Sequence, residues 1–319
     1  MKPQTYIIGG GITGLLAAYY LKLPLISKNI GGQLSHKYSL GPRLLHFLEP
    51  NIILLKDLNY NGGKLDIKRH RIGYFMTGVI LDDVNDECRR MYYCKSRDLN
   101  YSFSVPNSVM SDNQSIICAI NVDFNELINK LYNNIKSLHI QHNVKSIDPV
   151  NRILVLDNNE TLKYDKLIVT IPFNVFLRIF DNGSFYNLFS LKYIGIKYVI
   201  GESVVVNEFF GNYSYLYFID DEQLFHRITK IKDNLFCIDF VDKYSDEEII
   251  KECENHDINV KDIIHIKNAQ ILSLSETDKI RRNTLFKDCV FIGRYAEWEH
   301  GIKIQDTLTK IWRVKNELL

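Results

Sequence analysis

The amino-acid sequence predicts a mixed α/β fold in which a parallel-sheet unit is interrupted by inserted segments. Two observations lead to this prediction. The chain opens with an apolar strand (Thr5–Ile8), a helix rich in Ala and Leu (Ile12–Leu21) and a second apolar strand (Leu23–Ser27), which is a βαβ pattern. Two later stretches, 61–115 and 173–275, are rich in aromatic residues, and polar alternation in the second favours antiparallel strands.

The remaining α/β elements follow from apolar periodicity. Asp123 and Glu126 have the spacing of a helix N-terminal capping pair, and apolar residues then recur at helical spacing. We expect further strands at His139–Ile147, Arg152–Leu156, Lys166–Ile171 and Val290–Ile292, and a last helix at Ile302–Leu318. The predicted core unit comprises 1–60, 116–172 and 280–319, and the predicted substrate or cap unit comprises 61–115 and 173–279.

Length, charge and cysteines narrow the class of protein. The chain has 319 residues, enough for one large or two interleaved domains, and its net charge of +1 gives no global attraction for nucleic acid or acidic membranes. None of the six cysteines forms a C-x-x-C pair. No signal peptide or membrane span is expected, because glycines interrupt the first apolar stretch. We therefore expect a cytoplasmic protein.

The first turn carries the strongest chemical signal. Gly9-Gly10-Gly11-Ile12-Thr13-Gly14 fits the pattern G-x-G-x-x-G between a strand and a helix. Gly9 permits a tight turn, Gly11 lets the backbone approach a pyrophosphate, and Gly14 lets the helix pack on the strand. The helix N-terminus offers N–H groups to phosphates. The sequence thus predicts a dinucleotide site; the alternative is a plain glycine-rich turn.

One expected part of a dinucleotide site is missing. An acidic residue usually ends the second strand and binds the ribose hydroxyls. Here that position falls at Ser27 or Lys28. Serine can form a weaker hydrogen bond, whereas lysine cannot accept one. The departure fits poorly with a plain NAD-dependent dehydrogenase.

Several later motifs resemble the flavin-dependent amine oxidase superfamily, which includes protoporphyrinogen oxidase and UDP-galactopyranose mutase. They are, in chain order, Gly31-Gly32-Gln33-Leu34-Ser35, Gly41-Pro42-Arg43, Val144-Lys145-Ser146-Ile147, the strand from Tyr164 to Pro172, and Phe291-Ile292-Gly293-Arg294-Tyr295. The resemblance implies a discontinuous, Rossmann-like FAD-binding domain with an inserted α+β substrate domain. It also implies FAD held non-covalently, since no Cys or His lies in a covalent flavin motif.

The chain departs from this family pattern at four places. Gln33 stands where the family has Arg, and Arg43 stands where the mutase has His. Lys303-Ile304 replaces the mutase's Met-Asp, and Trp298-Glu299-His300 replaces its Tyr-x-Tyr. These changes argue against a straightforward sugar mutase.

The glycine motif and the resemblance together assign the cofactor contacts. The implied set is Gly9, Gly11, Ile12, Thr13, Gly14, Ser27, Lys28, Gly32, Gln33, Leu34, Arg43, Val144, Thr170, Gly293, Arg294, Gly301, Ile302 and Lys303. The helix that begins near Gly301, together with Lys303, would place positive charge beside the flavin ring and favour its reduction. Arg294 has a surface salt bridge as its alternative role.

Four residues are candidates for the chemistry itself. His46 matches a histidine of the mutase element, and His300 is a candidate base. Arg227 follows Phe225-His226 in a segment that resembles a substrate-domain strand, and Trp298 is a candidate for stacking on substrate or flavin. Each has a purely structural alternative. The arginines between Arg69 and Arg97 are expected to form a solvated face.

The predicted function is a flavin oxidoreductase that takes a hydride from a carbon next to nitrogen, or from a related bond, of a small or nucleotide-linked substrate. One alternative is a non-redox flavoenzyme of the mutase kind. Another is an FAD enzyme that modifies a nucleic-acid base in a virus, for which salt-dependent DNA binding would be the sign. The last is a flavin-binding scaffold without catalysis. The sequence leaves the oligomeric state open.

Overall fold

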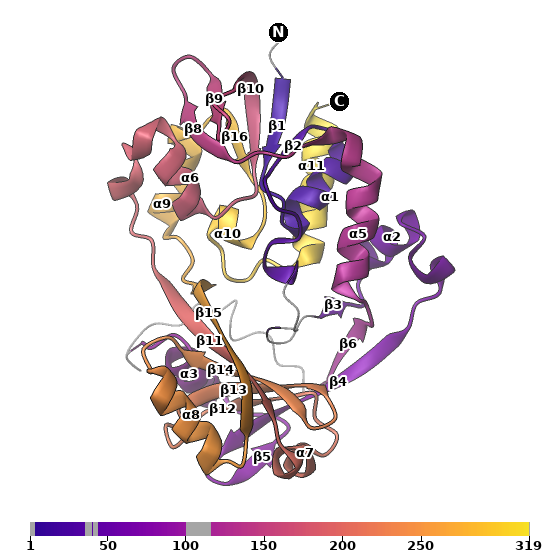
Figure 1. Cartoon of the computed structure of the whole chain (residues 1–319), viewed down its shortest axis with the longest axis vertical. Coiled ribbons are helices and arrows are strands. Elements are labelled where there is room, and N and C mark those ends of the chain that lie inside the picture. Colours follow the sequence, from indigo (N-terminus) through magenta and orange to yellow (C-terminus); the bar gives the residue numbers. More distant parts are fainter. Residues whose placement is uncertain (1–3, 36–39, 41–43, 100–115, 319) are drawn as a thin grey trace.

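Two sheets, each covered by helices, make up the computed structural model, which describes residues 4–35, 40, 44–99 and 116–318 (Figure 1). The first sheet contains seven strands. Its order is β7 (His139–Ile140), β2 (Leu25–Ile26), β1 (Gln4–Ile8), β10 (Thr161–Val169), β9 (Ile153–Leu156) and β8 (Val144–Asp148), with β16 (Cys289–Phe291) also paired to β10. β7, β2, β1, β10 and β16 are parallel, whereas β10, β9 and β8 form an antiparallel meander.

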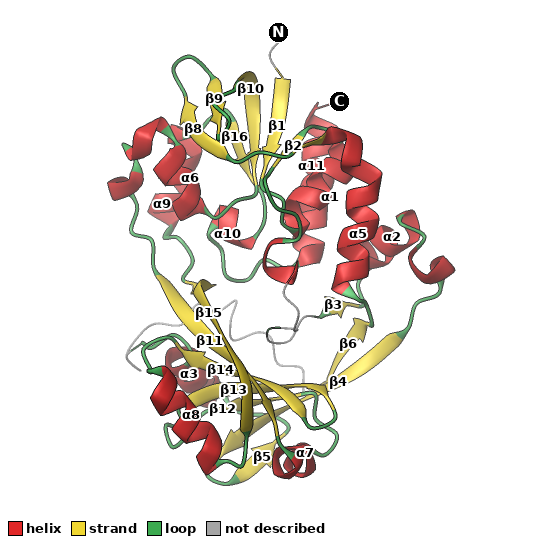
Figure 2. Cartoon of the chain, in the orientation of Figure 1, coloured by secondary structure: helices red, strands yellow, loops and turns green. Residues whose placement is uncertain are grey.

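Helices cover both faces of the first sheet (Figure 2). One group packs in an aliphatic cluster with Ile7 and Leu25, and it comprises α1 (Ile12–Leu21), α2 (Glu49–Asp57), α5 (Phe124–Ile135) and α11 (Ile304–Leu318). The opposite side holds an aromatic cluster around Phe173, Phe176, Phe286 and Phe291, together with α6 (Phe173–Ile179), α9 (Glu276–Leu285) and α10 (Arg294–Glu297). The sheet is therefore buried on both faces, as parallel sheets usually are.

The second sheet contains nine strands and is largely antiparallel. Its order is β15 (Asn259–Ile271), β11 (Tyr193–Glu202), β14 (Leu235–Val241), β13 (Phe225–Lys232), β12 (Tyr215–Phe218), β4 (Ile67–Met76), β6 (Ile116–Ile120) and β3 (Leu45–His46), with β5 (Val79–Leu81) paired to β4. Its helices are α3 (Asp86–Lys95), α7 (Val204–Phe210) and α8 (Asp246–Asn255). β4 and β12 are parallel, and they join the early and the late segments of this sheet.

The mixed α/β fold with parallel and antiparallel sheets confirms the predicted fold class in outline. The structure divides the chain differently from the predicted units at two places. β6 pairs with β4 and β3, so it belongs to the second sheet although it lies in the range 116–172. α6 lies in the range 173–279, yet its Phe173 and Phe176 are buried in the aromatic cluster on the first sheet, and α9 crosses the predicted boundary at 279. Burial of these rings accounts for the difference.

Two local predictions are also refined. Asp123 caps α5 by accepting from the backbone N–H of Asn125 (2.8 Å) and Glu126 (3.3 Å). In a capping pair the N–H of the capping residue donates to the side chain three residues later, whereas the N–H of Asp123 donates to the Tyr60 hydroxyl at 3.0 Å. The predicted strand His139–Ile147 is two strands, because β7 pairs with β2 whereas β8 pairs with β9. Asp157 holds the bend between them, 2.7 Å from Nδ1 of His142.

Candidate active site

The glycine turn lies at the carboxyl end of β1, and its backbone needs two of its glycines for different reasons. Gly9 has φ +115°, a conformation that residues with a side chain rarely adopt. A Cβ on Gly14 would lie 1.7 Å from the carbonyl oxygen of Gly9, so α1 can pack this closely only without a side chain there. The Thr170 hydroxyl donates to the carbonyl oxygens of Ile8 (2.8 Å) and Gly9 (3.0 Å). The conformational roles expected for Gly9 and Gly14 are confirmed.

Gly10 and Gly11 differ sharply in their surroundings. A Cβ on Gly10 would lie 2.1 Å from the carbonyl oxygen of Asn29 and 2.2 Å from Oγ of Ser27, so this position also requires glycine. A Cβ on Gly11 would meet no atom of the described residues within 4 Å. Gly11 is the N-cap of α1, which has no side-chain cap there. Open space beside an uncapped helix N-terminus suits a diphosphate.

The residues after β2 support the turn. Ser27 is 7% exposed, and its hydroxyl donates to the carbonyl oxygen of Asn29 at 2.7 Å, beside Gly10. Lys28 is exposed. Ser27 therefore packs against the glycine turn. Neither Ser27 nor Lys28 supplies the carboxylate that usually binds the ribose hydroxyls.

The Gly-Gly segment folds back over the same turn. The N–H of Gly31 donates to the carbonyl oxygen of Gly10 at 2.8 Å, and Gly31 forms a bridge with Gly11. Gly32 has φ +57°, and a Cβ there would lie 3.2 Å from Cα of Gly11. Gly32 begins a short 3-10 helix that also holds Gln33 and Leu34, so the expected cofactor residues of this segment start beside Gly11.

Two other expected cofactor residues have different outcomes. Arg43 lies outside the described residues. Val144 begins β8, where it packs, half-buried, against the apolar cluster that also contains Ile8 and Ile26.

The turn after β16 completes this side of the site. Gly293 has φ +94°, and a Cβ there would lie 2.6 Å from Oγ1 of Thr13 in the first turn of α1. Nε of Arg294 donates to the carbonyl oxygen of Ile302 at 3.2 Å, which closes the loop from Arg294 to Ile302. The N–H of Lys303 donates to Asp306 at 2.8 Å at the start of α11, and Gly301 is exposed.

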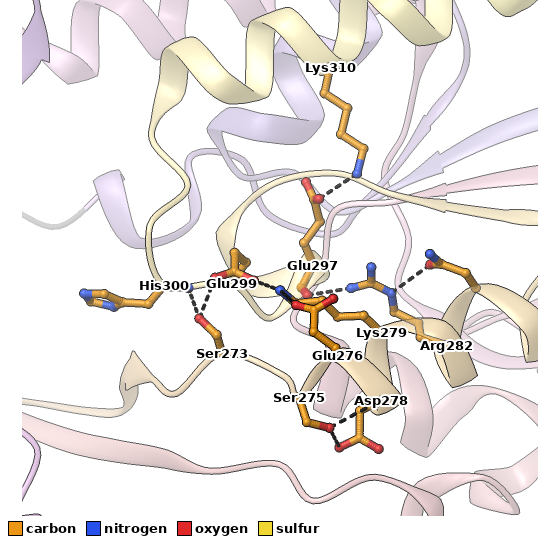
Figure 3. A network of polar contacts seen from close by, with 11 residues as sticks. Ser273, Ser275, Glu276, Asp278, Lys279, Arg282, Glu297, Glu299, His300 and Lys310 are labelled. Carbon is orange, nitrogen blue, oxygen red and sulfur yellow. Dashed lines mark hydrogen bonds and ion pairs between the residues drawn. The ribbon is translucent and has the colours of Figure 1, made fainter. Parts of the chain in front are cut away.

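A polar network braces this loop from behind (Figure 3). Glu297 accepts from the N–H of Gly293 at 3.0 Å and from Nζ of Lys310 at 2.6 Å. Glu299 accepts from the Ser273 hydroxyl at 2.6 Å and pairs with Lys279 at 2.8 Å. The same Ser273 oxygen accepts from the N–H of His300 at 3.0 Å. The two glutamates, which are close in sequence, thus fix the backbone on either side of Trp298, and Figure 3 shows the His300 ring pointing away from the network.

The His300 ring meets Arg97, which comes from the segment just after α3. Nη2 of Arg97 lies 2.7 Å from Nε2 of His300. Because a guanidinium only donates, Nε2 must be the acceptor and the ring proton must lie on Nδ1. Burial, and then the charges of Arg97, Arg294 and Arg227, lower the pKa of His300 to about 2. The ring is therefore neutral, and its basic lone pair is already committed to Arg97.

Arg97 is the functional candidate that sequence reasoning missed. It is 5% exposed and lies over the ring of Tyr93, 3.8 Å from the centroid. Its Nη1 donates to the Ser96 hydroxyl at 2.8 Å. The sequence placed it among arginines of a solvated face, and its contact with His300 spans most of the chain, so no local pattern could reveal it.

Arg227 is committed to another partner. Its guanidinium donates to Asp239, which is fully buried, as is the neighbouring His226. Burial lowers the pKa of Arg227, but the adjacent Asp239 outweighs this and holds the pKa well above its usual range. An ion pair across β13 and β14 therefore occupies the arginine that was expected to face a pocket.

The remaining two candidates lie in structured surroundings. Trp298 is 0% exposed and packs in the aromatic cluster, with its ring edge-on to Tyr193 at 6.1 Å between centroids. This burial favours the core-packing alternative over stacking on a substrate. His46 is half-buried on β3, and its carbonyl oxygen accepts from Nδ2 of Asn51 at 2.9 Å.

Comparison with solved structures identifies the class of fold. In fold, this chain is similar to a mutase, an amine oxidase and an oxidoreductase, as the resemblance inferred from the sequence predicts. A reduced UDP-galactopyranose mutase is similar with a TM-score of 0.74 at 13% identity, covering 99% of this chain and 95% of the mutase. Putrescine oxidase bound to putrescine is similar with a TM-score of 0.64 at 12% identity, over 99% and 98% of the two chains. An oxidoreductase from Methanosarcina mazei is similar with a TM-score of 0.66 at 12% identity, over 98% and 99%.

Three further findings concern sequence relatives, metal ligands and membrane-spanning helices. No family model and no curated protein matches the sequence. Within the described part of the chain, no cluster of three or more His, Cys, Asp or Glu side chains could hold a metal ion. Among the same residues, no helix combines the length and the apolar character needed to span a bilayer.

Proposed function

We propose that the chain binds FAD non-covalently and is a flavin-dependent oxidoreductase that removes a hydride from a carbon next to nitrogen, or from a related bond. The open space beside Gly11 at the N-terminus of α1 carries this proposal. Gly9, Gly10 and Gly14 are glycines because neighbouring atoms leave no room for a side chain or the backbone turns sharply, but a Cβ on Gly11 would meet no atom of the described residues within 4 Å. A diphosphate is the group that such a cradle accommodates.

The proposal assigns a task to each part of the site. The amides of Ile12 and Thr13 would bind the diphosphate, and the segment from Gly32 to Leu34 would cover it. When bound, FAD would supply the hydride-accepting chemistry of the reaction. The braced loop from Gly293 to Lys303 would hold the flavin ring, and Lys303 would favour its reduced, negatively charged form. The discontinuous FAD domain and the inserted substrate domain are part of the same proposal.

An absorption spectrum of the purified protein tests the cofactor. We expect the two visible bands of oxidised flavin, and heat denaturation should release the flavin into the supernatant because no covalent bond holds it. A colourless protein that takes up no added FAD would overturn the proposal. Loss of the flavin absorbance when candidate substrates are added without oxygen then tests for hydride transfer, with substrate-free buffer as the control.

Similarity to the mutase supports a second candidate, a non-redox flavoenzyme that acts on a nucleotide-linked sugar. Its TM-score of 0.74 exceeds those of the putrescine oxidase and of the Methanosarcina mazei oxidoreductase. The distinguishing result would be turnover only after reduction with dithionite, with no net change in the oxidation state of the substrate. Lys303-Ile304, in place of Met-Asp, makes this the second choice.

A further inference from the structure

Arg97 is a buried cation without an acidic partner among the described residues. It is 5% exposed, and its hydrogen bonds go to the Ser96 hydroxyl, the carbonyl oxygen of Tyr93 and the neutral ring of His300. Its Nε is buried and has no hydrogen-bond partner within the described part of the chain. Buried charges in proteins are normally paired, because removing an isolated charge from water costs several kcal/mol. The missing partner of Arg97 therefore needs an explanation.

Arg227 shows what pairing looks like. Its side chain is 17% exposed and forms an ion pair with the fully buried Asp239. Arg97 instead lies near two further cations, since the charges of Arg227 and Arg294 add to burial in lowering the pKa of Arg97. The charges of all three arginines lower the pKa of His300, and among the described residues only Arg227 of the three forms an ion pair with a carboxylate.

The free edge of the Arg97 guanidinium matches an anion. Nε and Nη2 form the fork that binds both oxygens of a carboxylate or a phosphate. In Arg97, Nε has no partner, and Nη2 holds only an uncharged ring nitrogen, 2.7 Å away. An anion could therefore bind at this edge without displacing any acidic side chain of the described chain.

Arg97 is one of the residues that line a cleft. The cleft has a volume of about 660 Å³, within the usual range for small-molecule sites. Leu191, Ile194 and Leu272 give it an apolar side. Its acidic residues have basic neighbours, because Asp98 pairs with Lys243 and Asp242 lies 3.7 Å from His265. The cleft thus offers apolar surface for the body of a ligand beside the segment that carries Arg97.

We propose that Arg97 binds an anionic group of the substrate, either a carboxylate or a phosphate, and that the substrate is therefore an acid and not a simple cationic amine. This inference rests on the proposed function and specifies its substrate class. A cationic amine would bring a positive charge towards Arg97, which no carboxylate of the described residues neutralises, and like charges repel in a low-dielectric site. An acid would supply the missing counter-charge.

Isothermal titration calorimetry of the full chain with FAD bound tests this inference. The probes are inorganic phosphate, benzoate and benzylamine, of which the last two have similar size and opposite charge. We expect phosphate or benzoate to bind more tightly than benzylamine, and the tighter anion shows which chemistry the site prefers. Arg97→Gln should weaken the binding of that anion about tenfold or more, which is the usual effect of losing a charged hydrogen bond. Arg90→Gln, a more exposed change on α3, should leave it unchanged within about twofold.

Three outcomes would overturn the inference: tighter binding of benzylamine, no binding of either anion, or equal anion binding by Arg97→Gln and wild type. If Arg97→Gln does not fold, the order of the three probes on wild-type protein still decides, and Arg97→Lys keeps the charge but loses the fork. A protein that binds flavin but neither anion would contradict only the inference about Arg97. A protein that binds no flavin but binds an anion through Arg97 would contradict only the FAD proposal.

Discussion

Gly293 and Thr13 are in direct contact, although they come from opposite ends of the chain. A Cβ on Gly293 would lie 2.6 Å from Oγ1 and 2.9 Å from Cγ2 of Thr13. The turn after β16 therefore sits against the first turn of α1, where the proposed diphosphate cradle begins. The geometry of that cradle depends on both ends of the chain.

Gly293→Ala tests this contact. The φ of +94° suits only glycine, and the new methyl group would strike Thr13, so we expect a loss of about 2–4 kcal/mol in the free energy of unfolding. Adding Thr13→Ala should recover about 1 kcal/mol, because it removes the clash but not the backbone strain. Urea denaturation of the wild type and of both variants measures this. No recovery in the double variant would contradict the proposed clash.

Gly11 and Gly14 form a matched pair within one motif. Gly14→Ala places a methyl group 1.7 Å from the Gly9 oxygen and should destabilise the protein by about 3 kcal/mol, with or without cofactor. Gly11→Ala meets nothing, at φ −69° and ψ 177°, so the flavin-free protein should keep its stability within about 0.5 kcal/mol. Fluorescence titration with FAD should show about tenfold weaker binding for Gly11→Ala. Undiminished affinity would place the diphosphate elsewhere.

The neutral His300 makes stability depend on pH. Its pKa is lowered to about 2 in the folded protein from 6.5, so the unfolded chain binds a proton first as the pH falls. Its contribution is complete above about pH 6.5 and is lost between there and pH 2, by at most about 1.4 kcal/mol per pH unit. His300→Gln keeps an acceptor for Arg97 but cannot titrate, so its urea midpoint should fall less between pH 7 and pH 5. Parallel curves for wild type and variant would rule this out; His142→Gln, at an exposed site, is the control.

The Arg227–Asp239 pair decides between a structural and a substrate-binding role for Arg227. Arg227→Met leaves a buried carboxylate without its partner and should cost about 3–5 kcal/mol. Changing both residues, Arg227→Met with Asp239→Leu, should restore most of the loss. Breaking the exposed Arg152–Asp288 pair with Arg152→Met should cost less than about 1 kcal/mol. Were Arg227 mainly a substrate ligand, its replacement would change affinity and leave the unfolding curve in place.

Substitutions of Trp298 distinguish a role in core packing from a role in catalysis. Its ring is fully buried and its Nε1 has no hydrogen-bond partner, so Trp298→Phe loses volume but no polar contact. We expect Trp298→Ala to cost about 3–5 kcal/mol, and Trp298→Phe clearly less, with flavin binding retained in Trp298→Phe. Thermal denaturation and the visible spectrum of each variant provide the measurement. A Phe variant with normal stability but no turnover would restore the stacking hypothesis.

The sequence predicts well what a few neighbouring residues decide. Gly9 and Gly14 serve a turn that begins and ends within six positions, and Asp123 caps a helix that starts at the next residue. The ends of β1 and β10 and the strand β16 are short apolar runs that a parallel sheet buries on both faces. Each of these features has a local physical cause, so it can be inferred without the fold.

Contacts between distant segments could not be predicted in this way. Arg97 and His300 meet only because the second sheet and its helix α3 pack towards the loop after β16. The partner of Arg227 is Asp239 on the neighbouring strand, and hydrophobic patterning does not specify which polar side chains face each other there. Ser27 turned inward because Gly10 leaves room for it, a relationship that appears only once β2 and the turn are placed together.

The order of strands in the first sheet bears on how the protein is made. β1 leaves the ribosome early, but its partner β10 comes only in the middle of the chain, and β16 and α11 come near its end. Until then the nascent chain exposes an unpaired strand edge and the apolar face of α1, both of which attract chaperones or aggregate. Recombinant production should therefore tolerate an added C-terminal tag far better than removal of residues from Cys289 onwards.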